Sequence, residues 1–283
     1  MTKRVISVFL CVLCVISSIS FIVSAKENKE YTSDNFLSVA DGIIAWKKAD
    51  NGSEPDGYLI NDKYLENAGT TPGDWYPIAL GRLGIQDNNE GYLAVIKDRV
   101  EERYRESGRL SAAKATEWHR IALAVLAMGG DPTNFGTDEN GAPINLIADG
   151  TYDRGKTTPL GRQGINGWIW GLITLDSMRY AVPDGAYNTR DDIIVEIISK
   201  QLSDGGFALS SDDADPDITA MAITALAPYY NSEKIYSYHR KALSADESKT
   251  VHEVVDEAVL CLSRLQLDTG DYKSWGTQNV EST

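Results

Sequence analysis

The sequence predicts an all-helical fold built from repeats, and three observations lead to this expectation. Four mostly apolar segments recur along the chain, each with a polar or Gly/Pro-containing start and a body rich in Ala, Leu and Ile. Amphipathic segments lie before and between them, and few stretches alternate polar and apolar residues as a half-buried strand does. Apolar helices need burial, whereas amphipathic helices can expose one face to water. We therefore expect an inner ring of apolar helices surrounded by an outer ring of amphipathic helices.

The four apolar segments share a register that defines the repeat. They are GDWYPIALGRLG from Gly73, TEWHRIALAVLAMGG from Thr116, NGWIWGLITLDSM from Asn166 and PDITAMAITALAP from Pro216. Their spacings are 43, 50 and 51 residues when they are aligned on Trp75, Trp118, Trp168 and Thr219. Periods of this length are typical of repeat architectures, in which each unit buries its apolar face against the next.

The amphipathic segments lie before, between and after the apolar ones. They cover residues 35–48, 92–107, 190–202 and 251–265. In the third, Ile193, Ile194, Ile197 and Ile198 follow the i, i+3, i+4 spacing of a helix, with charged residues on the opposite side. In the last, Cys261 falls on the apolar side, where we expect a small core residue.

The first 25 residues have the layout of a secretory signal peptide. Lys3 and Arg4 form a basic start, an apolar run follows, and small residues precede a cleavage position after Ala25. We therefore expect a secreted or cell-surface protein. The alternative is an uncleaved anchor, because the apolar run is about long enough to span a bilayer.

Cleavage would leave an acidic chain with one cysteine. The formal charge of −14 would become −16, because cleavage removes Lys3 and Arg4 but no acidic residue. Cys11 and Cys14 leave with the signal, so Cys261 has no internal disulfide partner and stability must come from the core. An acidic surface argues against nucleic acid and anionic lipid as partners.

The turn QLSDGGF, from Gln201 to Phe207, has a second copy that starts at Gln266. With the repeat period, these turns resemble the prenyltransferase and squalene-cyclase repeats of the terpenoid cyclase/prenyltransferase superfamily. The resemblance implies an α/α toroid of about four to five repeats over residues 26–283, either a C-terminally truncated fragment or an incomplete ring. It also implies a structural role, that of tying neighbouring helices together, for Gln201, Phe207, Gln266 and Trp275.

The string DPDITA, which starts at Asp215, resembles the DxDDTA motif of squalene-type cyclases. The resemblance implies a terpene-cyclase or prenyltransferase-like enzyme with Asp217 as general acid and Asp215 beside it, although Ile218 replaces the last aspartate. Such an acid must stay protonated near neutral pH, which requires burial and a nearby like charge or hydrogen bond. A simpler interpretation makes Asp217 a helix N-cap that accepts the amide hydrogens of Thr219 or Ala220.

Two further resemblances bear on metals and cofactors. Protein prenyltransferase beta subunits hold zinc through a D-x-C pair and a distant histidine, but Val259 and Leu260 precede Cys261, so we expect no metal. The string DITAMAITAL from Asp217 resembles the toroidal domain of the vitamin B12 carriers, which are secreted and bind a corrinoid. That resemblance implies corrinoid binding as an alternative, and otherwise we expect no cofactor.

Aromatic residues at the starts of the apolar helices form a second constellation. They are Trp75, Tyr76, Trp118, His119, Trp168 and Trp170. If the inner helices all point the same end toward one mouth of the ring, these residues surround a single opening. An opening with aromatic walls suits a planar or apolar ligand, a sugar face or a carbocation. The alternative is that they pack against the next repeat. We expect non-catalytic binding of a small ligand or partner at this mouth, ahead of the enzyme and the corrinoid carrier.

Overall fold

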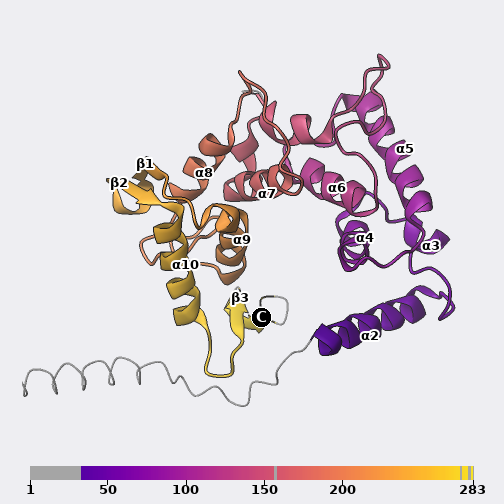
Figure 1. The fold of residues 1–283 in the computed structure, drawn as a ribbon, viewed down its shortest axis with the longest axis horizontal. Coiled ribbons are helices and arrows are strands. Elements are labelled where there is room, and N and C mark those ends of the chain that lie inside the picture. The colour runs from indigo at the N-terminus through magenta and orange to yellow at the C-terminus, as the bar shows by residue number, and fades with distance from the viewer. Residues whose placement is uncertain (1–32, 156–157, 275, 280–281, 283) are drawn as a thin grey trace, which may run out of the picture. The chain divides into compact units, whose positions relative to one another are not determined.

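The computed structural model describes residues 33–155, 158–274, 276–279 and 282, in two compact units that meet between Leu59 and Ile60. The described part of the first unit consists of helix α2 (Ser33–Asn51) and a turn, closed by a hydrogen bond of 3.0 Å from the Asn51 amide to the Leu59 carbonyl (Figure 1). The expected signal peptide lies outside the described residues. Within those residues, no helix has the length and apolarity to cross a membrane.

The second unit is mostly helical, which confirms the helical class predicted from the repeats. Its α-helices are α3 (Asp62–Leu65), α4 (Thr71–Leu83), α5 (Asn89–Ser107), α6 (Thr116–Ala127), α7 (Ile165–Asp176), α8 (Arg190–Ile198), α9 (Pro216–Leu226) and α10 (Val251–Leu265). Four short helical turns connect them: η1 (Ala148–Tyr152), η2 (Leu160–Gln163), η3 (Ala227–Tyr229) and η4 (Lys241–Leu243).

The four apolar segments of the sequence are α4, α6, α7 and α9, and they contact one another in succession (Figure 1). Their inward side chains form a continuous core, to which Leu80, Ile121, Leu172 and Ala222 each contribute while almost fully buried. The amphipathic α8 packs on α7, and the four isoleucines of its apolar face are fully buried. The periodicity therefore predicted both the helix and the face it buries.

Glycines allow close approach between these helices and their neighbours. A Cβ atom on Gly81 of α4 would lie 2.1 Å from the carbonyl oxygen of Ala127, at the end of α6. A Cβ on Gly167 of α7 would lie 1.9 Å from the carbonyl oxygen of Leu160. Both distances are far below van der Waals contact, so these positions require a residue without a side chain.

Two small antiparallel sheets were not expected from the sequence. Strands β1 (Ile235–Arg240) and β2 (Ala245–Thr250) form a hairpin between α9 and α10, and β3 (Tyr272–Ser274) pairs with β4 (Thr277–Asn279). In β1, Tyr236, Tyr238 and Arg240 are buried while the alternate residues are exposed. This period of two is the normal pattern of a half-covered strand.

The two Gln-containing turns have the same hydrogen-bond geometry. Gln201 Nε2 donates to the Gly205 carbonyl at 2.8 Å, and Gln266 Nε2 donates to the Gly270 carbonyl at 2.9 Å. Gly205 and Gly270 have φ values of +89° and +91°, which side-chain-bearing residues rarely adopt. The turns are thus structural repeats as well as sequence repeats.

The first turn is also tied into the core. Gln201 is fully buried and makes a second hydrogen bond, of 2.9 Å, to the Val254 carbonyl in α10. Phe207 is fully buried as well, whereas Gln266 is exposed. Gln201 therefore joins its turn to a neighbouring helix, as the resemblance implied. Trp275 lies outside the described residues.

The N-cap of α9 is Asp215, which corrects the expectation that Asp217 caps this helix. The Asp215 carboxylate accepts the Ile218 amide hydrogen at 3.0 Å, and Pro216 occupies the first helical position. Proline is favoured at that position because it has no amide hydrogen to satisfy and its φ is already helical. The residue before the proline therefore becomes the cap, and Asp217 lies inside the first turn.

Candidate functional site

Two hollows adjoin each other along the row of apolar helices. The larger, which we call the apolar hollow, has a volume of about 730 Å³ and lies over the later turns of α4, α6 and α7 and the end of α9. Most of its lining is apolar, including Ile78, Leu123, Leu126, Ile173, Met178 and Pro228. A concave surface with this lining is the usual form of a small-molecule site.

The smaller, which we call the polar hollow, has a volume of about 200 Å³ and lies at the first turns of the same three helices. Its polar lining residues are Thr71, Lys114, Thr116, Glu117, Arg120, Gln163 and Asn166. Three helices thus begin at one place and present polar groups there. The expectation that inner helices direct the same ends to one mouth agrees with this arrangement for α4, α6 and α7.

Trp75 of α4 and Trp170 of α7 line both hollows, so the two spaces adjoin at these rings. Their ring centroids are 5.6 Å apart, and the ring planes are inclined by 54°. Trp75 is 42% exposed, an unusual exposure for a tryptophan in a folded core, so its ring is accessible to a ligand. These are the two predicted ligand-binding residues that the structure brings together.

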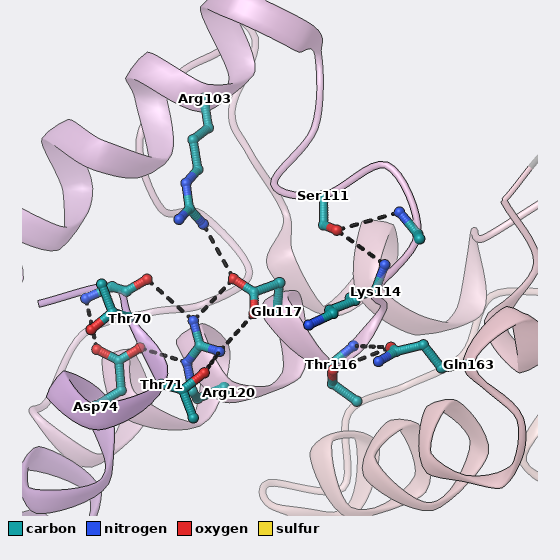
Figure 2. A network of polar contacts seen from close by, with 12 residues as sticks. Thr70, Thr71, Asp74, Arg103, Ser111, Lys114, Thr116, Glu117, Arg120 and Gln163 are labelled. Carbon is teal, nitrogen blue, oxygen red and sulfur yellow. Dashed lines mark hydrogen bonds and ion pairs between the residues drawn. The ribbon is translucent and has the colours of Figure 1, made fainter. Parts of the chain in front are cut away.

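An ion network, shown in Figure 2, contributes Glu117 and Arg120 to the lining of the polar hollow. Arg120 Nε donates to the fully buried Asp74 carboxylate at 2.8 Å, and Arg120 also donates to Glu117 at 2.7 and 3.1 Å. Asp74 accepts two further hydrogen bonds, each of 2.7 Å, from the Tyr92 hydroxyl and the Gly69 amide. The network therefore joins α4, α5 and α6.

Burial and the neighbouring charges shift the pKa values of the acidic residues in this network in opposite directions. Burial raises the pKa of Asp74, and the hydrogen bonds from Arg120 and Tyr92 limit that rise. Burial also acts to raise the pKa of Glu117, but Arg120 and Arg103 outweigh it and lower that pKa. Because opposite charges and hydrogen bonds favour the charged forms, the network holds its side chains in place without a ligand.

Three polar side chains that line the polar hollow have hydrogen-bonding groups without a described partner. The Gln163 amide oxygen accepts both the backbone amide and the hydroxyl of Thr116 at 3.2 Å, which leaves the Gln163 NH₂ without a described partner (Figure 2). Within the described part of the chain, the Lys114 ammonium forms no ion pair or hydrogen bond, and the buried amide oxygen of Asn166 has no partner. Lys114 and Gln163 line the polar hollow, so their unused donors are near a space that a ligand can enter.

Trp118 and His119 lie in the interior and line neither hollow. Trp118 is 3% exposed, donates from Nε1 to the Tyr104 hydroxyl at 2.7 Å, and has the Arg154 guanidinium 4.5 Å from its ring centroid. His119 is fully buried, with Nε2 2.9 Å from the Gly150 carbonyl oxygen. Burial lowers the pKa of His119 to about 3, so the ring is neutral at ordinary pH.

Tyr76 and Trp168 also line neither hollow, and each contacts other residues of the fold. Tyr76 meets Tyr64 edge to face, with ring centroids 6.5 Å apart. Trp168 is half-buried against Gly161, where a Cβ atom would lie 2.4 Å from the indole nitrogen. Of the six predicted aromatic residues, the site contains Trp75 and Trp170.

Asp215 and Asp217 lie in a third hollow, of about 480 Å³, at the start of α9. Asp217 is half-buried and accepts a hydrogen bond of 3.1 Å from the Ser282 hydroxyl, while Asp215 caps the helix. Asp213 and Lys273 also line this hollow, and none of its described lining residues is aromatic.

Metal ligands are not grouped anywhere in the described residues, where no three His, Cys, Asp or Glu side chains could hold one ion. Cys261 is 2% exposed and lies in the core, as its place on the apolar face of α10 predicted. Comparisons with family models, with curated proteins and with solved structures find no match for this chain.

Arg120, Lys114 and Gln163 line the site but were not predicted from the sequence as site residues. Arg120 carried a usable signal, because an arginine that directly precedes the apolar run IALAVLA of a buried helix needs a partner for its charge. Gln163 and Lys114 lie in connecting segments outside the repeat motif, and nothing in their local sequence indicates that they face α6 and α7.

Proposed function

We propose that this chain is a secreted or cell-surface repeat protein of the α/α-toroid type that binds a small ligand without transforming it. The observation that carries the proposal is the apolar hollow formed by consecutive apolar helices, with Trp75 and Trp170 at its edge. The succession of α4, α6, α7 and α9 and the repeated Gln turns support the ring architecture.

The apolar hollow has the properties of a binding site. Apolar ligand surface removed from water stabilises a complex by about 25 cal/mol per Å², before the cost of association is subtracted. The hollow presents leucine, isoleucine and methionine side chains next to two indole rings, which also attract planar groups. Exposed apolar groups of this kind on consecutive helices favour a binding role.

The surroundings of the aspartates support a non-catalytic role. The alternative, a terpene-cyclase or prenyltransferase-like enzyme, needs a protonated acid enclosed among apolar or aromatic groups. Asp217 is half-buried and accepts a hydrogen bond from the Ser282 hydroxyl, so a neutral polar group occupies its carboxylate. Asp215 is occupied as a helix cap.

A neutral fluorescent probe, N-phenyl-1-naphthylamine, tests the proposal on residues 26–283. We expect saturable binding, with the probe emission rising as it leaves water. Leu123→Glu places a charge in the apolar hollow and should weaken binding by at least about tenfold, because an unpaired charge in an apolar site costs more than 1.4 kcal/mol. The matched control is Leu260→Glu, on the exposed face of α10, where Leu260 is 58% exposed.

The proposal fails if the probe does not saturate, or if both variants lose binding equally. The two alternatives have their own readouts on the same protein. A corrinoid carrier would give a shift in the absorption spectrum of added cyanocobalamin. An enzyme would convert an added polyprenyl substrate, and Asp217→Asn would abolish the conversion.

A further inference from the structure

We propose that the ligand of this site is a monoanionic amphiphile, with its carboxylate in the polar hollow and its apolar part in the apolar hollow. The inference rests on the proposed binding function and adds the chemical class of the ligand. It draws on the relation between the two hollows, on the charge of the polar one and on its unused hydrogen-bond donors.

The two hollows form one elongated site that changes from polar to apolar along the same three helices. Each of the three helices contributes a polar residue to the polar hollow and an apolar residue to the apolar hollow. These pairs are Thr71 and Ile78 in α4, Thr116 and Leu123 in α6, and Asn166 and Ile173 in α7. Each pair is seven residues apart, which is two turns or about 10 Å along a helix. The Trp75 and Trp170 rings lie between the two ends. A ligand that follows the helices therefore needs one polar and one apolar end.

The charges of the polar hollow leave one positive charge without a partner. Glu117 and Arg120 pair with each other, and Asp74 and Arg103 behind them complete a balanced set of two acids and two bases. Lys114 is the remaining charged residue of the lining and has no described partner. In a chain with a net charge of −14, this local excess of positive charge favours an anionic group at this end.

Hydrogen-bond donors in the polar hollow also suit a carboxylate. The Gln163 NH₂ and the Lys114 ammonium are available, and α4, α6 and α7 begin here with the positive ends of their dipoles. A carboxylate accepts several such bonds at once. The single unpaired charge matches a monoanion better than a phosphate monoester, which carries up to two charges.

Competition against N-phenyl-1-naphthylamine tests the ligand class with four ligands of equal chain length, each kept below its micelle concentration. We expect dodecanoate to compete better than dodecanol, dodecylammonium and dodecyl phosphate. The margin over dodecanol should be about fivefold, as for an ion pair with a partly exposed partner. Dodecanol is the critical competitor, because it has the same alkyl chain and a polar end without the negative charge.

Lys114→Gln should reduce the preference for dodecanoate over dodecanol to within about twofold, while Lys114→Arg retains it. Lys273→Gln, in the separate hollow at α9, is the matched control and should leave the preference unchanged. The inference is overturned if any of the other three ligands competes as well as dodecanoate, or if Lys114→Gln leaves the preference intact. Probe binding with no carboxylate preference would overturn this inference alone, whereas absence of probe binding would overturn the proposed function.

Discussion

At the scale of single residues, His119 is a buried titratable group with no role in the proposed site. Its Nε2–H donates to the Gly150 carbonyl, and its Nδ1 has no described hydrogen-bond partner. Burial lowers its pKa to about 3, whereas a histidine in an unfolded chain titrates near 6.5. The unfolded chain therefore takes up a proton, as the pH falls, well before the folded protein does.

This difference predicts a loss of stability in mild acid. The contribution of neutral His119 is fully present above about pH 6.5 and declines as the pH falls toward 3, by roughly 1.4 kcal/mol per pH unit. Between pH 6.5 and pH 5 we expect a loss of about 2 kcal/mol in the free energy of unfolding. Urea unfolding at a series of pH values measures it.

His119→Gln is the control for this prediction, because glutamine can donate to the Gly150 carbonyl but does not titrate. Carboxylates also affect acid stability, so the relevant quantity is the difference in pH dependence between the two proteins. Parallel curves from pH 7 to pH 5 would show that His119 is not the group responsible.

Residue identity alone predicted only part of the site. Trp75 and Trp170 were accessible to sequence reasoning, since aromatic residues at helix starts repeat with the unit. The ion pair of Arg120 with Asp74 was not, because its members are 46 residues apart and only the packing of α4 on α6 joins them. The cap of α9 was predictable, because Pro216 marks the first helical residue and so identifies Asp215.

At the scale of elements, the two Gln turns form a natural comparison. Both glutamines close their own turn, but only Gln201 is buried and bonded to the Val254 carbonyl of α10. Gln201→Ala removes both Nε2 hydrogen bonds and leaves the carbonyl of the buried Gly205 without its described donor. A buried acceptor that loses its partner costs about 1–3 kcal/mol.

We therefore predict that Gln201→Ala lowers the free energy of unfolding by about 2 kcal/mol. Gln266→Ala should lower it by about 0.5 kcal/mol, because water replaces the lost bond at an exposed position. Chemical denaturation of both variants measures the difference. Equal effects would mean that the turn itself, and not its tie to α10, determines the stability.

Helices were predictable from the sequence because their signal is local. The segment expected at residues 251–265 is α10 with the same bounds, and Thr250 and Glu253 form a capping box at its start. The β1–β2 hairpin was missed because its strands are short and polar, and only Tyr236 and Tyr238 mark the buried face. Its pairing depends on contacts with α8 and α10 that no local pattern contains.

At the scale of the whole molecule, the charge distribution sets the conditions for the proposed ligand. A chain of net charge −14 repels an anionic ligand at long range, whereas Lys114 attracts it at short range. Salt at 0.15 M limits interactions between exposed charges to about 8 Å. Moderate salt therefore suppresses the general repulsion more than the contact with Lys114, and local chemistry decides the selectivity of the site.

The second unit is a succession of neighbouring helices, and this predicts a gradient of local stability. In repeat proteins each unit contacts mainly its neighbours, so the total stability is close to a sum of nearest-neighbour terms. Helix α6 has α4 on one side and α7 on the other, and α7 lies between α6 and α9. Helices α4 and α10 stand at the two ends of this series among the described residues.

Amide hydrogen exchange should therefore be slowest in α6 and α7. Opening of α4 or α10 breaks fewer helix contacts than opening of a central helix, so their amides should exchange through smaller, local unfolding events. Mass spectrometry of exchanged peptides from residues 60–283 measures this, with weakly protected loop peptides as the internal reference. Equal protection of all four helices would mean that the unit unfolds as one block, and that the helices cooperate beyond their nearest neighbours.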